Sequence, residues 1–160
     1  MRIAKESYLD QRLCAAVEQA TEDHLLGCVR LRAHRRNVRI ARTFVRFRLE
    51  AEQLTEATCD AAEWIVSELV TNVVVHHDWD LEPAVLVGIS RTAQYLHLEV
   101  HDTDPAIPRM APAAIDAEHG RGLWVVQGLS DSWGVGRTDE GKFVWARLVA
   151  WPGETSGSLR

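Results

Sequence analysis

The sequence has little of what would mark several classes of protein. Its three cysteines among 160 residues show neither CxxC spacing nor a histidine pattern for zinc. The cysteines are Cys14, Cys28 and Cys59. This odd, scattered set favours a reducing, cytoplasmic location. No apolar run reaches the length of a membrane-spanning helix, and the charged N-terminus lacks a signal-peptide core, so we expect a soluble protein with no membrane partner.

The chain also lacks an excess of positive charge. Its 18 Lys and Arg against 23 Asp and Glu give a net charge of -5, which argues against non-specific nucleic-acid binding. A local basic stripe is nevertheless present, because a helix would bring together Arg35, Arg39, Arg42 and Arg46. We interpret it as a solvated helix face. An acidic protein partner and, last, a nucleic acid are the alternatives.

The length and the 46% hydrophobic content fit one globular domain. We place that domain at residues 25–151, between an N-terminal extension at 1–24 and a disordered tail at 152–160. Internal repeats are absent, and so are the spacings of the Walker and Rossmann glycine loops. Two common kinds of nucleotide site are thereby excluded.

Hydrophobic periodicity predicts an α+β fold. The predicted elements are a short amphipathic helix at 5–20, a strand at 26–33, helices at 35–49 and 57–76, a hairpin at 84–90 and 95–101, a long surface loop or lid at 106–119, a helix behind Gly120 and Gly122, and a strand at 142–150. This order predicts two layers, with helices on one face of a mostly antiparallel sheet. A pocket should lie between the layers.

Residue types and spacing also predict a cap and a buried face for one helix. Thr55 or Thr58 can cap the helix at 57–76, whose buried stripe should contain Trp64, Ile65, Leu69 and Val73. We expect most of the tryptophans, including Trp64, Trp124, Trp133 and Trp145, to lie in the core or at a dimer interface.

The segment SELVTNVVVHH, residues 67–77, places an acid and an amide in an apolar helix. Glu68, Asn72 and His76 are spaced to share one face. Polar groups among core residues need a bound partner to offset their desolvation. A carboxylate can accept a proton and an amide oxygen can ligate Mg²⁺, a combination that suits phosphoryl transfer.

Two motifs follow further along the chain. In HDTDP, Asp102 comes just past a strand and can accept a hydrogen bond from an exocyclic amine, as on adenine. In HGRGL, Gly120 and Gly122 open a helix whose free backbone amides would attract phosphate oxygens. Arg121 can add a charge-assisted contact.

Taken together and in this order, the motifs resemble a known family. SELVTNVVVHH, HDTDPAIP and GRGLWVVQGLSDSWG followed by GKFVWARL are similar to the N, G1 and G2 boxes of the GHKL ATP-binding superfamily. The compact length and the ELVTN wording are most similar to bacterial anti-sigma-factor serine kinases, above all the single-domain actinobacterial ones. The resemblance covers about residues 25–151 and implies a Bergerat-type ATP site.

The resemblance also implies a role for each motif residue. Glu68 matches the general base, Asn72 the Mg²⁺ ligand and Asp102 the adenine-recognising carboxylate. The segment expected to close on the phosphates comprises Gly120, Arg121, Gly122 and Leu123. The implied cofactors are ATP and Mg²⁺. The implied partners are a sigma factor and an anti-sigma-factor antagonist that carries the target serine, and the family suggests a homodimer.

Two departures from the family pattern leave two hypotheses open. The superfamily's DxGxG has Asp104 and Ala106 at its glycine positions here, and an added carboxylate would either repel phosphate or face solvent. The first hypothesis is a serine/threonine kinase. The second is a non-catalytic binding module on the same fold, with ATP as ligand only or absent.

The cluster HHDWD offers His76, His77, Asp78 and Asp80 as metal ligands. Histidines at a helix C-terminus complement its dipole, and aspartates form turns. We therefore interpret this cluster as the end of a helix and its turn.

Overall fold

The fold was determined as a computed structural model that describes residues 24–76, 83–108, 110 and 121–151. Its elements are β1 (His24–Arg32), α2 (Arg35–Ala51), α3 (Glu56–His76), β2 (Ala84–Thr92), β3 (Tyr95–Asp102), α4 (Gly122–Leu129), β4 (Ser132–Thr138) and β5 (Gly141–Val149). The predicted helix at 5–20, the tail at 152–160 and most of the loop at 106–119 lie outside the described residues.

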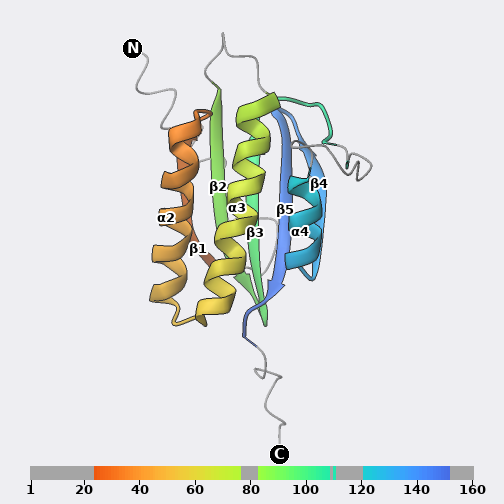
Figure 1. The fold of residues 1–160 in the computed structure, drawn as a ribbon. Helices are drawn as coiled ribbons and strands as arrows, with labels where there is room; N and C mark the ends of the chain where they lie inside the picture. The colour runs from red at the N-terminus through yellow and green to blue at the C-terminus, as the bar shows by residue number, and fades with distance from the viewer. Residues whose placement is uncertain (1–23, 77–82, 109, 111–120, 152–160) are drawn as a thin grey trace, which may run out of the picture.

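The strands form one antiparallel sheet in the order β1-β2-β3-β5-β4. The three described helices lie on one face of this sheet, as Figure 1 shows. The predicted two-layer α+β architecture is therefore confirmed. No helix in the described ranges is long and apolar enough to cross a membrane.

Side-chain periodicity places the core between the layers. Every second residue of β3, from Leu96 to Val100, is buried, and β5 buries Val144, Ala146 and Leu148 in the same way. The helix α3 buries the stripe from Ala62 to Val74 against this face. Thr55 accepts a hydrogen bond from the backbone N–H of Thr58 at 3.3 Å, so it is the residue that caps α3.

The predicted buried stripe of α3 is correct except at Trp64. This side chain is 60% exposed, and Trp124 on α4 is 43% exposed. Both tryptophans directly precede or follow a buried residue, so the helical rotation of about 100° per residue turns them away from the core. The prediction that Trp64 belongs to the buried stripe was wrong, and for both exposed tryptophans a dimer interface stays a prediction. Trp133 packs against the core as expected.

The strand β4 was not predicted. The sequence predicts a helix behind Gly120 and Gly122 and then only the strand at 142–150, but α4 ends at Leu129 and the chain then pairs with β5. The glycines of β4 weaken the sequence signal for a strand, because glycine has low strand propensity. Added Cβ atoms at Gly134 and Gly136 would lie 2.8 Å from the Trp145 ring and 2.1 Å from the Phe143 ring. The glycines therefore make room for aromatic rings on β5.

The basic stripe of α2 has a structural role at one end. Arg46 pairs with three carboxylates of α3, those of Glu63, Glu56 and Asp60, and these contacts raise the pKa of its guanidinium. Arg42 approaches Glu63 at 3.5 Å. Part of the stripe thus joins α2 to α3, which leaves fewer of its charges for a nucleic acid.

Candidate functional site

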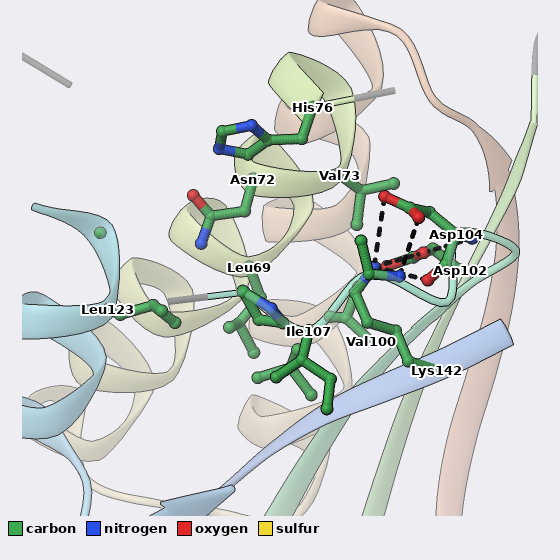
Figure 2. Close-up of a pocket in the computed structure, with 14 residues that line it drawn as sticks. Leu69, Asn72, Val73, His76, Val100, Asp102, Asp104, Ile107, Leu123 and Lys142 are labelled. Atoms are coloured by element: carbon green, nitrogen blue, oxygen red, sulfur yellow. Dashed lines mark hydrogen bonds and ion pairs between the residues drawn. The ribbon is translucent and has the colours of Figure 1, made fainter. Parts of the chain in front are cut away.

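A cavity of about 420 Å³ lies between the sheet and α3. Its walls come from α3, from the ends of β3 and β5, from the segment after β3, and from the start of α4 (Figure 2). The lining residues are Leu69, Asn72, Val73, His76, Val100, Asp102, Asp104, Ala106, Ile107, Pro108, Gly122, Leu123, Lys142 and Val144. The cavity therefore combines apolar walls with a few polar groups, as small-molecule sites do.

The helix α3 contributes Asn72 and His76, which project one above the other beside the cavity (Figure 2). Glu68, one turn earlier, is half-buried and does not line the cavity itself. It lies instead against the start of α4, since a Cβ at Gly122 would be 2.7 Å from Glu68 Oε2 and 3.4 Å from Asn72 Oδ1. Gly122 thus permits close approach of α4 to both polar residues.

The start of α4 brings in two more of the predicted residues. Gly122 and the buried Leu123 line the cavity, and Arg121 is the exposed N-cap residue. The Arg121 carbonyl accepts hydrogen bonds from the backbone N–H groups of Trp124 and Val125 at 3.0 and 3.1 Å. Gly120 lies outside the described residues.

Asp102 lies at the opposite end of the cavity, paired with a residue that belongs to none of the three sequence motifs. The Lys142 ammonium lies 2.9 Å from Asp102 Oδ1, and their side chains are 8% and 2% exposed. The two residues face each other in the register of β3 with β5. Lys142 shares its strand face with buried Val144, and this period-2 pattern could have identified it as inward-facing.

The segment after Asp102 forms a hydrogen-bonded turn. Asp102 Oδ1 accepts from the Asp104 backbone N–H at 2.8 Å, and Asp104 Oδ1 accepts from the Ala106 N–H at 2.9 Å. The other carboxylate oxygen of Asp104 lies 3.8 Å from Lys142 Nζ. The carboxylate of Asp104, which stands at a glycine position of the family pattern, is thus held by the turn and lies near the Lys142 ammonium.

Burial raises the pKa of Glu68 above its ordinary value. Its ionised form is disfavoured in the folded protein, so unfolding becomes easier as the pH rises from about 4 through the raised folded pKa. A carboxylate shifted in this direction is also a better proton acceptor near neutral pH.

We expect the Glu68→Gln variant to be more stable than the unmodified protein at pH 7, because it removes a carboxylate that is costly to ionise in place. The advantage should shrink as the pH falls toward about 4, where the carboxyl is protonated in both states. Urea unfolding of both proteins at several pH values measures this difference in the free energy of unfolding. A variant that is less stable at pH 7, or a difference independent of pH, contradicts the prediction.

Comparison with known proteins defines the class. The model of the histidine kinase-like ATPase domain matches residues 31–148, and the chain belongs to this family. This confirms the resemblance to the GHKL superfamily at the level of the domain.

Among solved structures, the chain is similar to one described as the RsbU and RsbW domains of Rv1364c from Mycobacterium tuberculosis. The TM-score is 0.58 and the sequence identity 14%, over 78% of this chain and 32% of that one. The chain therefore spans about a third of the length of that structure, and the similarity concerns the fold. No curated protein matches the sequence.

Proposed function

We propose that this protein binds ATP with Mg²⁺ and transfers phosphate to a serine of an anti-sigma-factor antagonist, while also binding a sigma factor. The observation that carries this proposal is the junction of α3 with α4. There Glu68 and Asn72 meet Gly122 beside a cavity that ends at Asp102. The resemblance to anti-sigma-factor serine kinases supports the partner class, and membership of the ATPase family supports the cofactor.

The residues around the cavity fit a magnesium nucleotide. A volume of about 420 Å³ falls within the range of about 300–1,000 Å³ that is usual for ligand sites. Asn72 offers an amide oxygen at one end, and Asp102 a carboxylate at the other. The described part of the chain has no cluster of three His, Cys, Asp or Glu side chains for a metal. A Mg²⁺ ion bound through one protein oxygen and substrate phosphates does not need one.

Each residue then has a task. Asp102 accepts a hydrogen bond from the exocyclic amine of the base, and Asn72 ligates the metal. The first backbone amides of α4, at Gly122 and Leu123, donate to phosphate oxygens, with the Arg121 charge nearby. We assign Gly120 to the same segment. ATP supplies the phosphoryl group, and Mg²⁺ offsets its charge.

Glu68 is the proposed general base. It accepts the proton of the target serine hydroxyl, and its raised pKa favours this task near neutral pH. Its carboxylate lies beside Gly122, which lines the cavity.

The alternative is a non-catalytic module that sequesters its partner, with ATP as ligand only or absent. Asp104 at a glycine position favours it, and so does the position of Glu68 outside the cavity lining. Transfer of labelled phosphate from ATP to a neighbouring antagonist protein separates the two functions. Labelled antagonist supports the kinase. Binding of ATP without labelling supports the module.

Mg²⁺ and ATP together should raise the melting temperature, because a ligand that binds only the folded state stabilises it by mass action. At about 100 times Kd the stabilisation is about 2.7 kcal/mol, which shifts the melting temperature of a domain of this size by several degrees. Differential scanning fluorimetry with Mg²⁺ alone as the blank measures the shift.

Asn72→Ala should reduce this shift, whereas Gln127→Ala should not, because Gln127 is an exposed amide of α4 that does not line the cavity. No shift at millimolar ATP would count against both ATP-dependent functions.

A further inference from the structure

Lys142 is a buried cation in the cavity whose charge no proposed step uses. Its side chain is 8% exposed and lies across from Asp102 in the register of β3 with β5. Its Nζ donates to Asp102 Oδ1 at 2.9 Å and to the Asp104 backbone carbonyl at 2.7 Å. Figure 2 shows Lys142 converging with Asp102 and Asp104 at one end of the cavity.

The hydrogen bonds at this end leave one donor and one acceptor uncommitted. An ammonium group has three N–H donors, of which two are used, and Asp104 Oδ2 at 3.8 Å is too distant for a third hydrogen bond. Asp102 Oδ1 accepts from both Lys142 and the Asp104 N–H. Among the described residues, no hydrogen bond is made to Asp102 Oδ2. The cavity thus presents a cationic donor beside an anionic acceptor.

This pair distinguishes the cavity from one that holds a carboxylate alone. The edge of a 6-amino purine offers an amine donor beside the ring acceptor N1, whereas a 6-oxo purine offers the acceptor O6 beside the donor N1–H. A lone carboxylate repels O6, because both groups are acceptors. A lysine next to the carboxylate can donate to O6 while Asp102 accepts from N1–H. For a 6-amino purine the order along the edge is reversed: Lys142 donates to N1 while Asp102 accepts from the amine, so the two kinds of base bind with the purine edge turned over.

We propose that Lys142 is a specificity-determining residue that lets the cavity bind 6-oxo purine nucleotides as well as ATP. The inference rests on the proposed function, in which the base lies at the Asp102 end of the cavity. It assigns the ammonium two tasks, donation to the base and neutralisation of the adjacent carboxylates.

The test compares ATP with inosine triphosphate, which exchanges the 6-amino group for an oxo group. Calorimetric Kd values for the two nucleotides are measured with Mg²⁺ in the same buffer. For the unmodified protein we expect the two Kd values to agree within about tenfold, because each base satisfies both groups. Lys142→Met should weaken the binding of inosine triphosphate relative to that of ATP by about tenfold or more, since a hydrogen bond to a charged group is lost.

Two variants complete the design. Lys142→Gln retains a neutral N–H donor and should keep the selectivity closer to that of the unmodified protein than Lys142→Met does. Arg137→Met removes an exposed cation from β4 opposite Lys142 in register and should leave both Kd values unchanged.

A preference of the unmodified protein for ATP above about 100-fold overturns the proposal, and this measurement needs no variant. If the ratio of the two Kd values is unchanged in both Lys142 variants, the proposal is overturned as well. If neither nucleotide binds the unmodified protein, the proposed function itself fails, and the inference fails with it. If ATP binds the unmodified protein but the ratio of the two Kd values differs from the expected one, the inference about Lys142 alone is wrong.

Discussion

Glu68→Gln is expected to lower phosphate transfer to the antagonist protein by about 10²- to 10⁴-fold, the usual contribution of a positioned general base. The amide keeps the shape of the side chain against Gly122 but cannot accept the serine proton. The affinity for ATP should change little, because Glu68 does not line the cavity. Single-turnover transfer of labelled phosphate, together with calorimetric ATP binding, separates the two effects.

Glu56→Gln is the matched control, because it makes the same change in an exposed carboxylate at the other end of α3. It should leave the transfer rate unchanged. A Glu68→Gln variant that transfers phosphate at the normal rate would remove Glu68 from the mechanism.

Gly141→Ala is expected to destabilise the fold by about 3 kcal/mol, the upper part of the range for overpacking. A Cβ at this position would lie 2.1 Å from the Asp102 carbonyl oxygen and 2.8 Å from two backbone carbons of Thr103. Because these neighbours are backbone atoms, the start of β5 must move away from β3 to relieve the clash. That movement would separate Lys142 from Asp102, so ATP affinity should fall as well.

Gly128→Ala is the control for this substitution. A Cβ at Gly128, in α4, meets nothing within 4 Å. Alanine there should stabilise the protein by about 0.5–1 kcal/mol, since it is the better helix former. Urea unfolding of both variants gives the two free energies, and a Gly141→Ala protein with the stability of the unmodified one would contradict the expected clash.

Much of the site was predictable because its signals are local. The spacing of Glu68 and Asn72 fixes them on one face of a helix, and the alternation in β3 fixes the side toward which Asp102 points. The structure places Asn72, Asp102, Gly122 and Leu123 around one cavity, as the combined motifs predicted. The catalytic and ligand roles of these residues remain predictions.

The errors arose where local preference and tertiary context disagree. The glycines of β4 weaken its strand signal, yet they are needed for the rings of Trp145 and Phe143 on the neighbouring strand. Trp64 was expected in the buried stripe because it lies within a periodic apolar segment, but the packed layer covers only one side of α3. In both places the deciding contacts come from residues distant in the sequence.

The sequence by itself determined the α+β class, the helix that carries Glu68 and Asn72, and the family, because periodicity and motif spacing are properties of a short stretch of chain. Only the tertiary structure decided that Lys142 pairs with Asp102, 40 positions away, and that Gly122 lies against Glu68. Such pairings depend on strand register and on the packing of helix against helix. No local pattern specifies either of them.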